Sequence, residues 1–468
     1  MCTSEALPFA KTGGLADVCG SLPLALEALG IEVTLFLPRY QCVEKSGFSI
    51  ESKGSGLAHT VIGKNIDVYF VESEKYFDRE ALYGDIDGDY ADNLDRYQFF
   101  SEKVLKLIKT LGIQPEVIHC NDWQTALIPV LMKEKFKKDL YYQNIKTVLT
   151  IHNLAYQGVF PLEEYKKIGI KGSLYSHPEF EFYGKVNLLK AGILYSDRVT
   201  TVSQRYAKEI LTTEYGCGLE DILRSRDDGI EGILNGLDYE EWSPKDDELL
   251  LQNYSIETYA AAKQRNKSAL QKILGLKEGK KFPLFGFVGR LSHQKGVDLI
   301  IESMEDILRG GAQVVVQGVG DEDYQKQLIS LAKKYPEQVA RCFEFNEKLA
   351  HWIYAGSDFF LMPSNFEPCG LSHMISSRYG TVPIVFNTGG LADTVIDAQE
   401  SEGNGFVFKS YSKKNFIKVI HRACNVFEDK EKFAEIIKRA LNARFSWDES
   451  ALKYKELYTC LSSELQVG

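Results

Sequence analysis

The feature that most constrains the fold is an alternation that recurs along the whole chain. Short apolar, β-branched runs are followed by loops rich in Gly, Asn, Ser and Asp, and then by segments of helical hydrophobic spacing. This pattern is typical of βα units that build parallel sheets. The strands that it predicts are 32–37, 116–119, 146–151, 198–202, 232–234, 284–288, 313–317, 359–362 and 382–386. We therefore predict an α/β fold.

The chain has 468 residues, more than one hydrophobic core usually organises, so two domains are expected. The best candidate for a boundary is WSPKDDELLLQNYS at 242–255, which follows the last strand of the first half. The run FPLFGFVG at 282–289 then opens a new sheet. We predict a Rossmann-like domain over 1–243 and a second over 244–443, with parallel sheets facing a central cleft.

Composition excludes several classes of protein. The net charge is −10, which argues against a nucleic-acid partner because binding to phosphates requires a basic surface. No apolar run is long enough to span a bilayer, so no membrane partner is expected. The nine cysteines lack metal-ligand spacing, so no metal is predicted. The first residues carry no secretion signal, which favours the cytoplasm, or a plastid if a transit peptide has been removed.

The hexapeptide TGGLAD occurs twice, at 12–17 and 388–393. Each copy follows a strand and opens a helix, and the first continues with Val18 and Leu22 at helical spacing. Such a loop offers unpaired backbone N–H groups, a positive helix end and glycines that admit a ligand close to the backbone. Either loop taken alone is equally well explained by glycines that serve only a tight turn.

Three cations and one carboxylate stand out near predicted strand ends. Lys11 precedes the first glycine pair, although a solvated surface lysine is the simpler interpretation. Arg290 and Lys295 lie five residues apart between a strand and a helix, where they could clamp a diphosphate. Glu367 could accept hydrogen bonds from sugar hydroxyls, or could simply be an acid at a positive helix end.

Polar residues also follow other strands, as a pocket lining would. They are Asp122, Trp123, His152, Asn153 and Asn235. The segment 83–101 combines aromatic and amide side chains, among them Tyr83, Tyr90 and Asn93, which suit a carbohydrate, although a solvated loop would have a similar composition.

Taken together, the motifs resemble those of the bacterial-type glycogen and starch synthases. The matching segments include PFAKTGGLADV, HCNDWQTA, TIHNLAYQG, VGRLSHQKGVDLI, PSNFEPCGL and TGGLADTV. The resemblance implies a GT-B glycosyltransferase whose second domain binds a nucleotide-sugar donor and whose first domain contacts an α-glucan acceptor, without a metal or other cofactor. It also implies that a terminal helix, residues 444–468, crosses back onto the first domain.

The resemblance also implies a role for each matching residue. Lys11, Arg290 and Lys295 would hold the donor phosphates, and Glu367 and His152 would lie by the donor sugar, completing the catalytic group. The other donor-binding positions would be Gly14, Asn235, Phe345, Gly370, Leu371, Ser372, Gly389 and Gly390. The glucose pocket and acceptor side would comprise Asp17, Asp122, Trp123, Asn153, Tyr83, Tyr90 and Asn93.

The implied reaction transfers an α-glucosyl group from a nucleoside diphosphate glucose, in this family usually ADP-glucose, to the 4-hydroxyl of an α-1,4-glucan with retention of configuration. Three positions depart from the family pattern: Asn365 stands where Arg is usual, His373 where Gln is usual, and Phe345 where bacterial members often have Tyr. Two alternatives stay open: a glucan-binding regulatory pseudoenzyme, and a related retaining transferase that makes a small saccharide. Because little chain precedes the first glycine loop, we also expect a short first strand and a less stable first domain.

Overall fold

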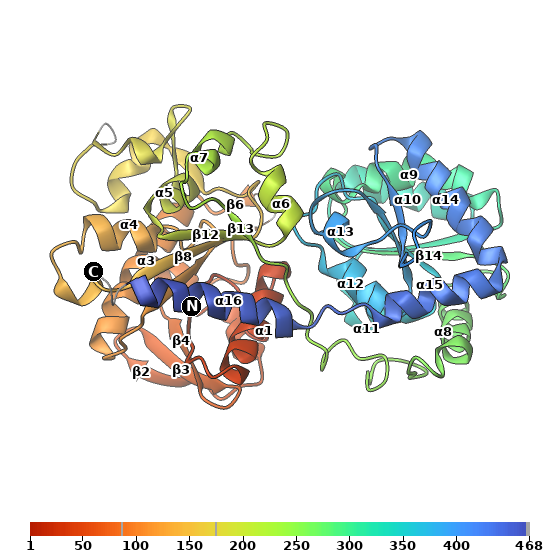
Figure 1. The fold of residues 1–468 in the computed structure, drawn as a ribbon, viewed down its shortest axis with the longest axis horizontal. Helices are drawn as coiled ribbons and strands as arrows, with labels where there is room; N and C mark the ends of the chain where they lie inside the picture. The colour runs from red at the N-terminus through yellow and green to blue at the C-terminus, as the bar shows by residue number, and fades with distance from the viewer. Residues whose placement is uncertain (86–87, 174–175, 465–468) are drawn as a thin grey trace. The chain divides into compact units, whose positions relative to one another are not determined.

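The computed structural model describes residues 1–85, 88–173 and 176–464 (Figure 1). The chain forms two compact units, Met1–Gly236 with Trp447–Gly468 as unit 1, and Leu237–Ser446 as unit 2. We predicted boundaries after residues 243 and 443; the structure divides the chain a few residues away from both. The first difference arises because Trp242 stacks on His351 of unit 2, with ring centroids 4.5 Å apart.

Unit 1 contains two four-stranded ladders that the chain's first residues join. One ladder has the order β1 (Thr34–Pro38), β4 (Ile66–Val71), β3 (Leu57–Ile62), β2 (Glu51–Gly54), and the other β13 (Glu231–Gly232), β12 (Arg198–Thr201), β8 (Lys146–Ile151), β7 (Val117–Asn121). Cys2 forms parallel bridges to both Phe36 and Cys120. The Cys2 amide donates to the His119 carbonyl at 2.8 Å, and the Thr3 amide donates to that of Phe36 at 3.1 Å. A very short first strand thus unites one sheet.

Unit 1 also contains antiparallel strands that the sequence pattern did not predict. Strands β2, β3 and β4 form a meander, and β9 (Val159–Pro161), β11 (Lys185–Asn187) and β10 (Glu181–Phe182) form a separate three-stranded antiparallel sheet. A further two-stranded pair is formed by β5 (Gly84–Asp85) and β6 (Gly88–Asp89). These strands are short, with two to six residues each, so the longer βα pattern masks them.

Helices cover both faces of the unit 1 sheet. They are α1 (Gly14–Ala28), α2 (Glu74–Phe77), α3 (Asn93–Thr110), α4 (Leu127–Glu134), α5 (Leu188–Tyr195), α6 (Gln204–Glu209), α7 (Glu220–Arg224) and α16 (Trp447–Glu464). Helix α16 lies beside α1 in Figure 1, and the two share a hydrophobic cluster that includes Val18, Leu22, Tyr454 and Leu461. The end of the chain is therefore part of the unit 1 core, although residues 465–468 lie outside the described residues.

Unit 2 is a parallel α/β sheet. Its order is β16 (Val339–Cys342), β15 (Gln313–Gln317), β14 (Leu284–Val288), β17 (Phe359–Met362), β18 (Val382–Phe386), β19 (Phe406–Phe408). The predicted strands 284–288, 313–317, 359–362 and 382–386 are confirmed, whereas β16 and β19 were not predicted. The helices are α8 (Tyr259–Ile273), α9 (Val297–Leu308), α10 (Glu322–Lys334), α11 (Glu347–Gly356), α12 (Leu371–Arg378), α13 (Gly389–Thr394), α14 (Lys413–Glu428) and α15 (Lys430–Asn442).

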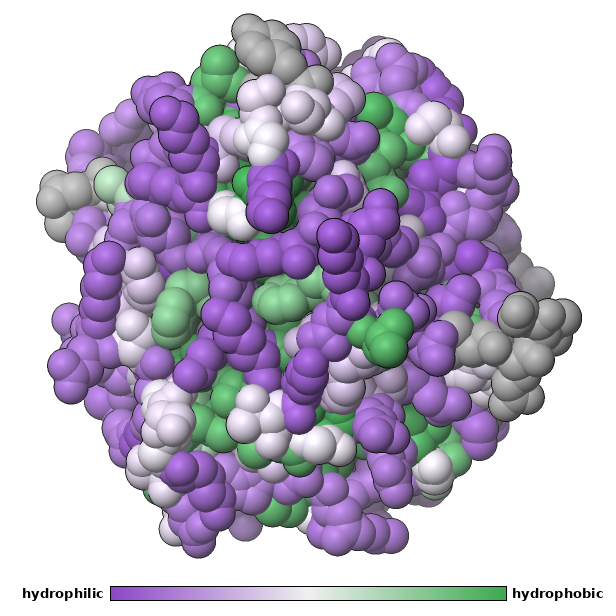
Figure 2. Space-filling model, turned by 90° about the vertical axis from the view of Figure 1, so that its left-hand side faces the viewer, coloured by the Kyte–Doolittle hydropathy of each residue, from purple (hydrophilic) through white to green (hydrophobic). Residues whose placement is uncertain are grey.

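The face of unit 1 shown in Figure 2 is mostly hydrophilic, with small hydrophobic areas separated by charged and polar side chains. No helix among the described residues has the length and apolar character needed to cross a membrane.

The contact between α16 and α1 gives the first testable prediction. Leu461 of α16 is fully buried in the shared cluster, whereas Leu452 of the same helix is 47% exposed. We expect Leu461→Ala to lower the free energy of unfolding by about 2–5 kcal/mol through lost contacts and a residual cavity. Leu452→Ala, the matched control, should change it by less than about 0.5 kcal/mol. Thermal unfolding followed by circular dichroism measures both, and equal effects would contradict the packing described.

Candidate functional site

The three charged residues that were predicted in unit 2 lie where the strand order reverses. Strand β14 has β15 on one side and β17 on the other, so the helices that follow β14 and β17 leave the sheet in opposite directions. Arg290 and Lys295 lie in the loop after β14, and Glu367 lies in the loop after β17. In open α/β sheets, ligands bind outside the carboxyl ends of the strands at this reversal.

Lys295 and Glu367 connect those two loops directly. The Lys295 Nζ lies 2.6 Å from Glu367 Oε2, and the Ser364 hydroxyl donates to the same oxygen at 3.0 Å. Glu367 is only 5% exposed, while the lysine side chain keeps 26% of its surface accessible. The buried carboxylate thus fixes the ammonium group, which can still be reached by an anion from solvent.

The second TGGLAD loop supports Glu367 from behind. A Cβ added to Gly389 would clash with the Glu367 carbonyl oxygen, and one added to Gly390 would clash with that of Cys369. The Gly390 amide donates to the Glu367 carbonyl at 3.1 Å. Glycine is required here because two backbone segments are in contact, and that contact positions the carboxylate.

The first TGGLAD loop is supported in a different way, by a residue that the sequence analysis did not select. The Glu5 carboxylate is 3% exposed and accepts the amides of Thr12 at 2.5 Å and Gly13 at 3.1 Å. It also accepts the hydroxyls of Thr12 at 2.6 Å and Tyr83 at 2.5 Å. The prediction of unpaired N–H groups is therefore wrong for Thr12 and Gly13, because the protein's own carboxylate occupies them. The acid seven residues before Thr12 was the signal that could have indicated this.

Gly13 itself differs from its counterparts in the second loop. A Cβ built on Gly13 would meet no atom within 4 Å, so packing does not require glycine there. The bare backbone lies open beside the start of α1, which begins at Gly14. The two identical hexapeptides therefore both begin a helix, but close backbone packing requires both glycines of the second and does not require Gly13 of the first.

Lys11 is paired with another predicted site residue. Its Nζ lies 2.7 Å from Asp17 Oδ1, across the first turn of α1. Burial raises the pKa of Asp17 above its ordinary value, and the Lys11 ammonium only partly offsets this. Beside the pair is a hollow of about 420 Å³, whose lining includes Phe9, Lys11, Lys45, Glu80 and Leu82.

Asp122 and His152 meet at the carboxyl ends of the neighbouring strands β7 and β8 of unit 1. The Asp122 Oδ1 accepts the His152 amide at 2.7 Å, and Asp122 adopts a φ of +58°, a costly conformation for a residue other than glycine. Burial raises the pKa of Asp122 to about 7 and lowers the pKa of His152 to about 3. The imidazole is therefore neutral at neutral pH.

The tautomer of His152 follows from its partner. Its Nε2 lies 3.0 Å from Asn121 Oδ1, while Asn121 Nδ2 donates to the Cys2 carbonyl at 3.0 Å. With the amide oriented in this way, Nε2 must carry the proton and donate it, so that Nδ1 is the acceptor nitrogen. The first strand thus orients His152 through Asn121.

Two other predicted residues of unit 1, Trp123 and Asn93, are buried. Trp123 is 9% exposed, and its ring contacts Tyr97 at 5.0 Å and Phe160 at 5.8 Å. Asn93 is buried and donates to the Tyr83 carbonyl at 2.8 Å.

Three further predicted site residues of unit 1 are Tyr90, Asn153 and Asn235. The Tyr90 ring lies against Arg79, at 4.5 Å from the ring centroid. Asn153 Oδ1 accepts the Ala155 amide at 3.0 Å, whereas the buried Asn235 Oδ1 has no hydrogen-bond partner among the described residues.

The remaining predicted donor residues lie at the carboxyl edge of the unit 2 sheet. Helix α12 begins at Leu371 and Ser372 after Gly370, which has a φ of +84°. His373 is fully buried, its Nε2 lies 2.5 Å from Thr394 Oγ1, and burial lowers its pKa to about 3. The neutral His373 therefore links α12 to α13. Phe345, between β16 and α11, is 85% exposed.

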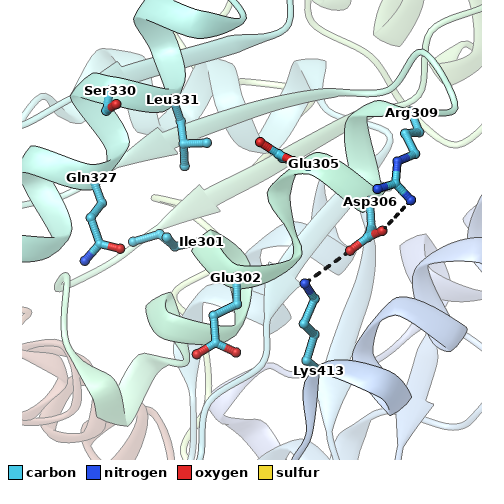
Figure 3. A pocket seen from close by; sticks show the side chains of 9 residues that line it. All are labelled: Ile301, Glu302, Glu305, Asp306, Arg309, Gln327, Ser330, Leu331 and Lys413. Carbon is cyan, nitrogen blue, oxygen red and sulfur yellow. Dashed lines mark ion pairs between the residues drawn. The ribbon is translucent and has the colours of Figure 1, made fainter.

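The other hollow lies in unit 2, has a volume of about 370 Å³ and contains none of the predicted residues (Figure 3). It lies along α9 and α10, and its Asp306 pairs with Arg309 at 2.9 Å and with Lys413 at 3.3 Å. Since it lies away from the strand ends and its Asp306 carboxylate is already paired, we do not assign a site there.

Comparisons with known proteins agree with this geometry. Residues 1–225 match the family model of the starch synthase catalytic domain, and residues 267–442 match that of glycosyl transferases group 1. A glycogen synthase of Geotalea uraniireducens is 45% identical over 470 residues, which are 97% of each chain. The glycogen synthase of Koribacter versatilis is 42% identical over 468 residues, 97% of this chain and 96% of the relative. The chain belongs to the glycogen and starch synthase family.

Solved structures support the same assignment to the glycogen and starch synthases. The catalytic domain of starch synthase IV from Arabidopsis thaliana matches with a TM-score of 0.88 and 32% identity, over 99% of this chain and 98% of that one. The predicted GT-B fold class is confirmed, and the chain is a glycosyltransferase of this family. The sucrose-phosphate synthase of Thermosynechococcus elongatus, with a TM-score of 0.63 and 16% identity, shares the fold alone.

The role of Glu5 can be tested with Glu5→Gln. The amide has one acceptor oxygen in place of two, so one pair of donors, either the Thr12 and Gly13 amides or the Thr12 and Tyr83 hydroxyls, faces its N–H groups instead of an acceptor. We expect the free energy of unfolding to fall by about 2–4 kcal/mol, because buried donors are left unpaired. Tyr83→Phe removes one of the donors to Glu5 and the contact of the same hydroxyl with Ser4 Oγ at 2.7 Å, but leaves the carboxylate in place, and should cost about 1 kcal/mol. Urea unfolding monitored by fluorescence compares them, and a smaller loss for Glu5→Gln would contradict this arrangement.

Asp122 leads to a prediction of pH dependence. Its folded pKa of about 7 exceeds the unfolded value of about 3.9, so the folded protein holds a proton that the unfolded chain releases between these pH values. This carboxyl therefore makes the protein less stable as the pH rises from about 4 to 7. Asp122→Asn keeps an acceptor for the His152 amide and should remove that loss. Relative to wild type, it should gain about 2–3 kcal/mol between about pH 5 and pH 8.

The measurement is the unfolding temperature of both proteins at several pH values, with Asp221→Asn as control because that carboxylate is 86% exposed. His152 acts with the opposite sign: its lowered pKa reduces stability as the pH falls below about 6.5, and it does so equally in both proteins. Parallel curves for wild type and Asp122→Asn would contradict the assignment of a buried, protonated carboxyl.

Proposed function

We propose that this protein transfers the α-glucosyl group of ADP-glucose to the 4-hydroxyl at the non-reducing end of an α-1,4-glucan, with retention of configuration. The observation that carries the proposal is the Lys295–Glu367 ion pair of 2.6 Å at the strand reversal of unit 2, with Arg290 in the same loop as Lys295. The relatives named glycogen synthase support a glucan acceptor and a nucleotide-sugar donor. The Arabidopsis starch synthase IV structure, described as bound to ADP and acarbose, supports ADP as the nucleotide.

The departing diphosphate is the group whose charge the protein has to stabilise. Breaking the bond between glucose and diphosphate leaves positive charge on the sugar and negative charge on the phosphates. Fixed cations stabilise that negative charge without having to reorient during the reaction. We assign this role to Arg290 and Lys295, and expect Lys11 to add a third positive charge. The guanidinium suits a bidentate contact with phosphate oxygens, and the ammonium acts as a point charge.

We propose that retention arises because the acceptor hydroxyl attacks from the face that the diphosphate leaves. The diphosphate oxygen can then accept the acceptor's proton, so no protein base is required on the opposite face. The neutral His152 fits this scheme, since an imidazole with a pKa of about 3 is not a protonated acid near neutral pH, and its Nδ1 can accept a hydrogen bond from a sugar hydroxyl. Because these cations serve the leaving group, we propose that no metal takes part.

A single assay tests the proposal. The purified protein is incubated with labelled ADP-glucose or UDP-glucose, with and without glycogen, in buffer containing EDTA. We expect label from ADP-glucose in polymer that an enzyme specific for α-1,4 bonds releases. Label only in a soluble saccharide would instead identify a small-saccharide transferase. Bound glycogen without any transfer would identify a regulatory pseudoenzyme, the role that Asn365 and His373 left open.

Lys295→Ala provides a quantitative prediction. Losing one preorganised cation should lower kcat about 10²- to 10³-fold, because the lost contact is strongest in the transition state. Lys334→Ala is the matched control: that lysine also forms a 2.6 Å ion pair, with Glu305, but is 59% exposed. Steady-state kinetics with ADP-glucose measure kcat for both variants, and their unfolding temperatures verify that they are folded. Turnover close to wild type in Lys295→Ala would contradict the role given to this loop.

A further inference from the structure

A tyrosine occupies an unfavourable backbone position at the tip of the β10–β11 hairpin. Phe182 pairs with Lys185 across the turn, which leaves Tyr183 and Gly184 as its two central residues. Their φ angles are +48° and +76°, so both lie in the left-handed region. Two-residue turns of this kind favour Asn-Gly, because a bulky side chain is costly at a positive φ. The fold alone gives no reason for a tyrosine here.

The Tyr183 side chain is 81% exposed, so burial does not repay the conformational cost either. Its ring meets Phe182 edge to face, with centroids 4.8 Å apart and an interplanar angle of 74°. The loop at Cys217 and Gly218 lies against the same rings, since a Cβ on Gly218 would be 3.1 Å from Phe182 and 3.4 Å from Tyr183. Cys217 has a φ of +50°, so a second strained residue adjoins the first.

A buried network holds this surface in place. Gln157 Nε2 donates to the Cys217 carbonyl at 3.1 Å, and Asn187 Nδ2 donates to Gln157 Oε1 at 2.6 Å. Gln157 and Asn187 are both buried. At the tip, the Gly184 amide donates to Glu181 Oε1 at 2.9 Å. The aromatic ring is therefore presented to solvent on a fixed support, which reduces the entropy lost when a ligand binds.

We propose that Tyr183 is the centre of a glucan-binding site separate from the catalytic loops. The C–H bonds on one face of a glucopyranose ring carry slight positive charge and pack against the negative π face of an aromatic ring. Glu181 and Lys185 are exposed on the two strands of the same hairpin, two residues from Tyr183 on either side, and can hydrogen-bond the sugar hydroxyls. A single ring flanked by charges suits a polar chain of sugars better than the contiguous apolar core of a protein interface. This inference rests on the proposed function, since the occupant is the polymer acceptor.

The site would act on polymer and not on short acceptors. The hairpin belongs to the small sheet of β9, β10 and β11, whereas the catalytic residues of unit 1 lie on loops of the large sheet. A glucan held at Tyr183 raises the local concentration of chain ends near the enzyme, as a second binding module does. A short maltooligosaccharide that fills only the catalytic site gains nothing from it.

The test uses Tyr183→Asn, which suits a positive φ but removes the ring, and Tyr183→Trp, which keeps an aromatic face. Leu140→Asn is the control, because Leu140 is 77% exposed elsewhere on unit 1. We expect Tyr183→Asn to weaken glycogen binding about three- to tenfold, the value of one aromatic contact, in affinity electrophoresis through glycogen-containing gels. Its unfolding temperature and its kcat and KM with maltotetraose should match wild type, and Tyr183→Trp and Leu140→Asn should bind glycogen normally.

Two results would overturn the inference while the proposed function stands. One is a folded, active Tyr183→Asn protein that binds glycogen as tightly as wild type. The other is an equal loss with glycogen and maltotetraose, which would make Tyr183 part of the catalytic site. A wild-type protein that neither transfers glucose nor binds glycogen would instead overturn the proposed function, and this inference with it.

Discussion

Parallel strands impose a geometric constraint from which the site follows. Each connection between such strands must return along a helix, so every loop that leaves a strand's carboxyl end emerges at one edge of the sheet. Where the strand order reverses, neighbouring loops diverge and leave room for a ligand. In unit 2 the reversal separates the loops that carry Lys295 and Glu367. In unit 1 it falls beside Met1–Thr3, between the loop that carries Lys11 and the loop that carries Asp122.

Buried glutamates organise both of these edges. Glu5 accepts the amides at the start of the first TGGLAD loop with its side chain, and Glu367 accepts the Gly390 amide of the second loop with its main-chain carbonyl. The Glu367 side chain is then available to hold Lys295. The same hexapeptide begins a helix in both places, but in one it is fixed by a carboxylate and in the other by backbone contact. The shared local shape explains why the two hexapeptides are identical, and the tertiary contacts determine what each one supports.

Burial sets the charges of Asp122 and His152 in unit 1. The same loss of hydration raises the pKa of Asp122 to about 7 and lowers the pKa of His152 to about 3, because in each case it disfavours the charged form. Near neutral pH, the strand ends therefore present a neutral imidazole and a carboxyl close to its midpoint. In unit 2 the fixed positive charges are those of Arg290 and Lys295. They suit the proposed reaction, whose main electrostatic demand is the departing diphosphate.

The sequence by itself determined the βα order, the main parallel strands and the loops on which the candidate residues lie. Hydrophobic period and turn residues are local properties, so 146–151 and 284–288 were predicted to the residue. It did not reveal the meander of β2 to β4, because those short strands interrupt the βα pattern that dominates the chain. Only the tertiary structure could show that Glu5 occupies the amides of Thr12 and Gly13, that Trp123 packs into the core, and that Tyr183 is exposed at a positive φ. These facts depend on contacts and burial between residues far apart in the chain, which no local pattern encodes.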